Sequence, residues 1–180
     1  MTTSNPRPSV SPRPSIGILP SPIASILAAV CTIALTAHQC PAAVVSWNGG
    51  SGSNWSTAAN WSGGRLPTPS DVAHFSGSGT SDVTINTNVS INGLDVKGGY
   101  TGTITQAAGA QLTVGSTGIL FAAGTFQGSD ATIDCNGPFT MSDGTFRSTA
   151  GTFSVLRNLT ISGGTFLHNA GTVTLDSYDK

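Results

Sequence analysis

Charged side chains are scarce in this sequence, and glutamate is absent from it. Asp, Lys and Arg together make up 8% of the 180 residues, and the formal net charge is −1 at pH 7. A nucleic-acid-binding protein presents a basic face, for which this chain has too few Lys and Arg residues. Gly, Thr, Ser and Asn are abundant instead, and no stretch after residue 43 repeats apolar residues every 3.6 positions. The composition therefore predicts β structure and argues against nucleic acid as a partner.

Cysteine is rare too, with three in the chain. Cys31 and Cys40 fall in or beside a segment with the features of a cleaved leader, so the mature chain would keep only Cys135 and a disulfide scaffold is excluded. We interpret Cys135 as a small buried hydrophobe, because a nucleophilic cysteine needs a neighbouring His or cation and none is predicted there. His and Cys also occur at no metal-ligand spacing, so we expect neither a metal nor a cofactor.

Paired catalytic groups are missing as well. Glycoside hydrolysis needs two carboxylic acids facing one cleft, and Asp134 is a single carboxylate among predicted outward hydroxyls. His74 and His168 fall in unrelated coils with no acid at catalytic spacing, and we interpret both as ordinary turn or surface residues. We therefore predict that the protein is not an enzyme, with a degenerate carbohydrate-active β-helix as an alternative.

The feature that dominates the sequence is a repeat. The phrase Gly-Thr-Phe stands at residues 124–126, 144–146 and 164–166, twenty residues apart each time. Superposing the coils that begin at these phrases aligns apolar residues in five columns, with Thr and Ser between them. Within a coil, four of the columns form two pairs spaced by two residues, which is the period of a strand with one buried face. A short fixed repeat of this kind predicts a stacked solenoid.

The predicted fold is an all-β, single-stranded parallel β-solenoid, a right-handed β-helix with about 20 residues and three short strands per coil. We expect the solenoid over residues 80–180, with an incomplete last coil, and expect residues 76–101 to form one irregular coil that joins it to the preceding segment. The predicted core columns include Phe126, Phe146 and Phe166, then Ile133, Phe153 and Val173, and then Cys135 and Val155.

Residues 1–42 have the features of a signal peptide. The first 15 residues carry two Arg and no acidic residue, and residues 23–37 contain no charge. Small residues follow at Ala42 and Ala43, where we place the cleavage. The uncharged run is shorter than the roughly 20 residues that a membrane span needs, so we expect no span in the mature chain. These features predict export to the extracellular space or the cell surface.

Residues 43–79 hold all three tryptophans of the chain, Trp47, Trp55 and Trp61. A solenoid must close its first coil against water, and an irregular segment with bulky aromatic side chains does this well. We therefore predict that the segment is an N-terminal cap. The alternative is that the three tryptophans are exposed and stack on sugar rings, which would make the segment a carbohydrate-binding module.

The same segment carries motifs that resemble those of a known group. Trp-x-Gly-Gly, Asn-Trp-Ser-Thr-Ala-Ala-Asn-Trp, Gly-Gly-x-x-Pro and Asp-x-Ala-x-Phe follow one another between residues 47 and 75, ahead of the Thr- and Gly-rich coils. This run resembles bacterial exported β-strand-repeat proteins, which are similar to autotransporter passenger domains. The resemblance implies a parallel β-helix displayed on the cell surface or shed from it, with a structural or adhesive role.

The last coil stops part-way, so its strands are predicted to leave an exposed pairing edge, which natural proteins usually cover or charge. Together these observations predict a non-catalytic, secreted or cell-surface β-solenoid that acts as a structural or adhesive module. Its expected partners are surface glycans or other surface proteins. For the open edge three covers remain as alternatives, namely another partner, end-to-end self-association and a continuation of the chain.

Overall fold

The computed structural model describes residues 42–50 and 52–176 of the chain. The predicted leader therefore lies outside the described residues, apart from Ala42. The described part is a β-solenoid of about 5 turns with about 21 residues per turn, as the sequence predicts. Its strands are joined by turns and by two short 3₁₀ segments, η1 (Ala58–Asn60) and η2 (Ser62–Gly64), and no α-helix occurs within the described ranges.

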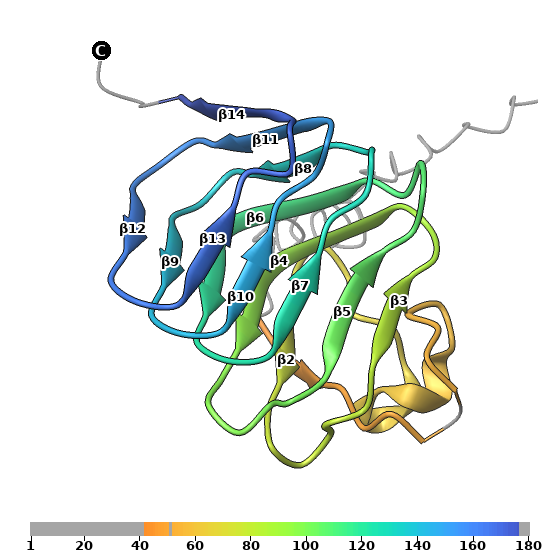
Figure 1. Ribbon diagram of the computed structural model, residues 1–180. Helices are drawn as coiled ribbons and strands as arrows, with labels where there is room; N and C mark the ends of the chain where they lie inside the picture. Colours follow the sequence, from red (N-terminus) through yellow and green to blue (C-terminus); the bar gives the residue numbers. More distant parts are fainter. Residues whose placement is uncertain (1–41, 51, 177–180) are drawn as a thin grey trace, which may run out of the picture. The chain divides into compact units, whose positions relative to one another are not determined.

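Three faces of parallel strands enclose the core (Figure 1). The first face runs along the front of Figure 1 and consists of β3 (Val83–Ile85), β5 (Thr103–Gln106), β7 (Thr125–Gln127), β10 (Thr145–Arg147) and β13 (Thr165–Leu167). The second face consists of the first halves of β4 (Val89–Val96) and β6 (Leu112–Phe121), followed by β8 (Ile133–Cys135), β11 (Thr152–Val155) and β14 (Thr172–Leu175).

The third face contains the first strand of the described residues. It consists of β1 (Val44–Ser46), β2 (Val72–Phe75), the second halves of β4 and β6, β9 (Phe139–Met141) and β12 (Leu159–Ile161). Residues 43–79 therefore supply two strands of the stack in addition to the loops between them.

The register of these strands confirms the apolar columns predicted from the sequence. Ile104, Phe126, Phe146 and Phe166 are consecutive partners on the first face. On the second face, Leu112, Ile133, Phe153 and Val173 are partners, and so are Val114, Cys135, Val155 and Leu175. Alternate residues point inward, and each coil completes the burial of its apolar side chains by stacking on the coils above and below it.

The glycine of the repeated phrase is required by the turn that precedes each strand of the first face. Gly124, Gly144 and Gly164 have φ values of 64°, 80° and 79°, a left-handed conformation that other residues rarely adopt. At Gly144 a β-carbon would also lie 2.7 Å from the backbone oxygen of Gly124 in the coil below. Both the conformation and the close approach of the coils explain why this glycine recurs.

The coil expected to be irregular, over residues 76–101, is irregular at one point. Val83, Val89, Ile91, Leu94 and Val96 continue the five columns in register with the next coil. The irregularity is a single register shift between Ile91 and Gly93 of β4. The columns here hold Val, Ile and Leu in place of the Phe residues of later coils, so the repeat is harder to recognise in the sequence than in the structure.

Candidate functional site

Hydroxyl groups line one outward column of the first face and most of one outward column of the second face. Thr103, Thr125, Thr145 and Thr165 are partners along the first face. On the second face, Asp134 is the one carboxylate in its column, and its Oδ1 accepts a hydrogen bond from Ser154 Oγ at 2.7 Å. Asn136 Nδ2 donates to the other oxygen of Asp134 at 3.3 Å. Side chains of the same corner thus engage both carboxylate oxygens, which favours a structural role for Asp134.

His74 lies next to an acid that its position in the sequence does not reveal. The third face aligns His74 with Asp95 one coil later, and His74 Nδ1 is 3.1 Å from Asp95 Oδ2. Lys97 Nζ is 3.5 Å from the same oxygen. The interpretation that no acid accompanies His74 is therefore wrong, because parallel stacking makes neighbours of residues 21 positions apart. His168, by contrast, lies exposed just after β13.

Ser46 is the partner of His74 on the other side, so a serine, a histidine and an aspartate follow one another in one outward column. Nucleophilic catalysis needs the serine hydroxyl within hydrogen-bonding reach of the imidazole. Within the described ranges no hydrogen bond joins the side chains of Ser46 and His74, and the backbone nitrogen of Ser46 donates to Ser62 Oγ at 2.9 Å. The arrangement therefore lacks the contact that would activate a nucleophile.

The three tryptophans form an aromatic cluster at the N-terminal end of the stack, which we call the head. Trp47, Trp55 and Trp61 are only 1–2% exposed. Trp61 packs edge-to-face on both others, with ring centroids 5.1 Å from Trp47 and 4.6 Å from Trp55. All three rings lie within 6.1 Å of Phe75. The hypothesis that these tryptophans are exposed platforms for sugar rings is wrong in this structure, because their faces are covered by one another and by the core.

The backbone and indole groups of the head are hydrogen-bonded as well. The indole nitrogen of Trp47 donates to the Ser81 carbonyl at 3.1 Å, and that of Trp61 donates to the Trp55 carbonyl at 2.8 Å. Trp55 and Thr84 also pair through their backbones, since Trp55 N donates to Thr84 O at 2.9 Å. Tyr100 is buried as well, and its ring centroid lies 5.3 Å from that of Phe75. The head is therefore closed by aromatic side chains and paired backbone.

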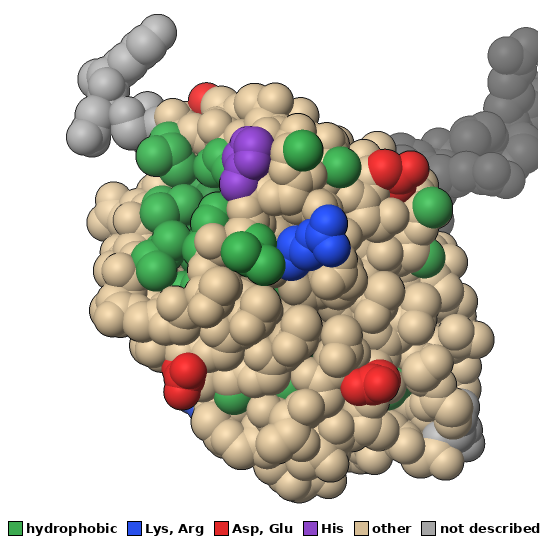
Figure 2. Space-filling model, viewed as in Figure 1, with side chains coloured by type: hydrophobic (Ala, Val, Ile, Leu, Met, Phe, Trp, Pro, Cys, Tyr) green, Lys and Arg blue, Asp and Glu red, His purple; other side chains and the backbone are tan. Residues whose placement is uncertain are grey.

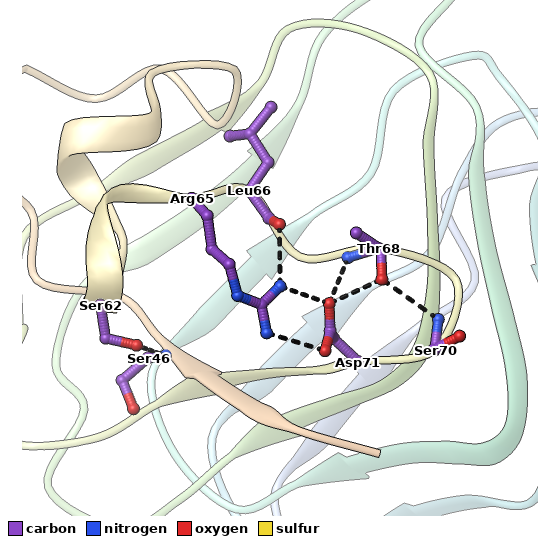
Figure 3. A network of polar contacts seen from close by, with 7 residues as sticks. All are labelled: Ser46, Ser62, Arg65, Leu66, Thr68, Ser70 and Asp71. Atoms are coloured by element: carbon purple, nitrogen blue, oxygen red, sulfur yellow. Dashed lines mark hydrogen bonds and ion pairs between the residues drawn. The ribbon is translucent and has the colours of Figure 1, made fainter. Parts of the chain in front are cut away.

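An ion pair between half-exposed Arg65 and buried Asp71 holds the loop that closes the head (Figure 3). The two terminal guanidinium nitrogens of Arg65 donate to the carboxylate of Asp71, at 2.7 and 3.0 Å, and the backbone nitrogen and hydroxyl of Thr68 donate to it at 2.8 and 2.7 Å. Chiefly because of the hydrogen bond from Arg65, the pKa of Asp71 lies well below its usual range. The carbonyl of Asp71 in turn accepts from the backbone of Asn92 at 2.8 Å, so the network ties the loop to β4. This gives the Gly-Gly-x-x-Pro and Asp-x-Ala-x-Phe motifs a structural role.

The predicted core residues lie where the columns place them. Phe126, Phe146, Ile133, Phe153, Cys135 and Val155 are fully buried. Burial also raises the pKa of the Cys135 thiol, whose Sγ donates to the Gly137 carbonyl at 3.4 Å. Phe166 and Val173 are partly buried and pack against the same core.

The last rung of the described residues forms the one large apolar surface at the end opposite the head. We call it the tail surface and define it by the final members of the inward columns, which are Leu159, Ile161, Phe166, Val173 and Leu175. Ile161 is 41% exposed and Leu175 is 60% exposed. In Figure 2 hydrophobic side chains gather on the part of the visible face where β12, β13 and β14 lie. Each of these strands pairs with a single neighbour within the described ranges, so each also presents an unpaired backbone edge.

No known family, curated protein or solved structure matches the chain. Within the described ranges, no helix is long and apolar enough to cross a membrane, and no three His, Cys, Asp or Glu side chains are grouped so as to hold a metal ion. The tail surface combines exposed apolar side chains with strand edges that no described strand covers, which makes it a candidate site.

Proposed function

We propose that the protein is an exported, non-catalytic β-solenoid that acts as a structural or adhesive module outside the cell. The observation that carries the proposal is the β-solenoid itself, whose first and second faces present outward columns of Thr and Ser side chains. Exposed apolar side chains such as Ile161 and Leu175 accompany them, and exposed apolar groups are typical of protein interaction sites.

The lateral faces support the same proposal. The outward columns of the first and second faces are rich in Thr and Ser and carry few charges, so these two faces offer a hydrogen-bonding surface. Such a surface suits a spacer or a display scaffold. The features of residues 1–42 and the resemblance of the head motifs to exported β-strand-repeat proteins support a location at the cell surface or in the medium.

Export is tested by expressing the whole chain in a bacterial host and determining the N-terminus of the product by intact-mass spectrometry after cell fractionation. We expect a product that begins at or next to Ala43 and is found outside the cytoplasm. A chain that keeps Met1 and stays in the cytoplasm would contradict the proposal.

Adhesion is tested by measuring how much labelled protein is retained on bacterial cells and on immobilised surface proteins. We expect retention to fall when Leu175 is replaced by Asp and to persist when Val44, equally exposed at the head, is replaced by Asp. Equal retention of both variants would rule out the tail surface as the adhesive site.

A further inference from the structure

Three asparagines of this chain are followed directly by glycine, at residues 48–49, 92–93 and 136–137. Asparagine is a thermolabile residue, and a glycine after it has no β-carbon to hinder the approach of its backbone nitrogen to the side-chain amide. We propose that Asn48 is a site of spontaneous covalent modification, through which the head of the protein is slowly altered after folding. The inference goes beyond the proposed function and does not depend on it.

The reaction needs no partner other than water. The backbone nitrogen of Gly49 attacks Cγ of Asn48 and forms a C–N bond, while the side-chain amide leaves with the proton of that nitrogen as ammonia. Water then opens the resulting succinimide at either of its carbonyl carbons. One opening gives aspartate, and the other gives isoaspartate, in which the side-chain methylene has become part of the backbone. Both products replace a neutral amide with a carboxylate.

The side chain of Asn48 is the least restrained of the three asparagines. It is exposed, and it forms no hydrogen bond within residues 42–50 and 52–176. Asn92 and Asn136 are partly buried. Oδ1 of Asn92 accepts from Ser116 Oγ at 3.5 Å, and Nδ2 of Asn136 donates to Asp134 Oδ2 at 3.3 Å. The Asn48 side chain is therefore free to turn toward the following backbone nitrogen, whereas each of the other two is held.

The three glycines differ in the same direction. Gly93 is buried within β4 and pairs with a strand on each side. At Gly137 an added β-carbon would lie 2.5 Å from the backbone nitrogen of Gly118, so the backbone of a neighbouring coil confines this residue. At Gly49 the nearest group is instead the hydroxyl of exposed Ser81, which can rotate away. The backbone at Gly49 can therefore move without the separation of paired coils that the other two sites require.

Modification at this position affects the head because the same groups hold Trp47. The indole nitrogen of Trp47 donates to Ser81 O at 3.1 Å, and Ser81 Oγ donates to Gly49 O at 3.4 Å. The backbone nitrogens of Asn48 and Gly49 donate to Asn60 O at 2.7 and 3.3 Å. The attack breaks the longer of these two bonds, and the lengthened backbone of isoaspartate shifts Gly49 away from both partners. We expect Trp47 to become more accessible to solvent as a result.

The test follows the purified protein during incubation in mildly alkaline buffer, which favours loss of the amide proton. Peptide mapping by mass spectrometry measures the conversion to aspartate and isoaspartate at each of the three sites. In the folded protein, conversion at Asn48 should be at least about tenfold faster than at Asn92 and Asn136, which corresponds to a barrier lower by about 1.4 kcal/mol. In concentrated urea the three rates should converge, because the dipeptide is the same and the fold no longer protects two of the sites.

Asn48→Gln is the matched variant, because the longer side chain would have to close a larger ring and reacts much more slowly. The side chain of Asn48 is exposed, so the variant should fold like the wild type, which urea melts establish. Quenching of tryptophan fluorescence by acrylamide should rise in the wild type in step with conversion at Asn48. In Asn48→Gln it should stay constant over the same incubation.

Each result decides a part of the inference. No conversion at Asn48, or equal rates at Asn48 and Asn136 in the folded protein, would overturn the assignment of the site. Conversion at Asn48 that leaves acrylamide quenching unchanged would overturn the loosening of the head. Export and adhesion are measured separately, so neither result bears on the proposed function.

Discussion

Phe146 lies at the centre of the solenoid core and provides the sharpest test of the stacked columns. Its ring is fully buried and stacks between Phe126 at 4.6 Å and Phe166 at 5.8 Å, with interplanar angles of 10° and 6°. The rings of Phe121 and Phe139 meet it edge-on at 5.5 and 5.0 Å. We expect Phe146→Ala to remove more stability than the truncation of any other ring of this column.

The magnitude follows from burial and from the shape of the site. Fully burying a Phe side chain is worth about 1.5–3 kcal/mol. Truncation also removes roughly 100 Å³ of side chain between two coils whose register is fixed, and if about half of that space stays open the cavity costs about 1 kcal/mol more. We therefore expect the free energy of unfolding to fall by about 3–5 kcal/mol, the usual range for Phe→Ala in a core.

Phe166→Ala is the matched control, because it removes the same ring from the same column at the open rung. Phe166 contacts rings on one side only, Phe146 at 5.8 Å, Phe139 at 6.1 Å and Phe153 at 6.3 Å. No closed cavity results, so the loss should be about 1–2 kcal/mol.

Urea melts followed by far-ultraviolet circular dichroism and by tryptophan fluorescence measure both variants, and the second probe reports on the head. A loss below about 1 kcal/mol for Phe146→Ala, or equal losses for the two variants, would refute the placement of Phe146 in a closed middle rung.

Three further predictions concern the head and the turns. Asp71→Asn should lower the free energy of unfolding by about 1–3 kcal/mol in urea melts, because Arg65 loses a buried charged acceptor. Since the pKa of Asp71 is lower in the folded than in the unfolded state, its contribution to stability should be complete above about pH 4 and should fade as the pH falls below that value. Below about pH 4 the wild type should therefore lose more stability than Asp71→Asn does. Equal losses in the two proteins would contradict this prediction. Gly144→Ala should cost at least about 1–2 kcal/mol, because Gly144 has φ of 80° and little space, whereas Gly98→Ala, where no atom lies within 4 Å of the added carbon, is the control and should cost much less. The buried tryptophans should resist quenching by acrylamide and show no fluorescence change when polysaccharides are added, and a saturable change would restore the carbohydrate-binding alternative.

The candidate site could be anticipated only in part. The incomplete last coil predicts an exposed edge after Leu175, and the structure adds that β12 is an edge too, because no strand of the described residues covers it. The role of Trp47, Trp55 and Trp61 could not be decided from their positions, since a tryptophan among Gly and Asn residues suits either a cap or a sugar-binding surface. Their burial depends on Phe75 and on strand β3, which reach them through the fold.

The sequence by itself determined the architecture of this protein. Its period of twenty residues and the alternation within each coil fix which side chains point inward, because a strand has two faces and a parallel stack repeats them in register. Only the tertiary structure decided which residues of different coils become neighbours outside the regular repeat. The approach of His74 to Asp95 and the packing of Trp47 on Trp61 depend on strand pairing near the N-terminal end of the stack, where the period of twenty residues is not visible in the sequence.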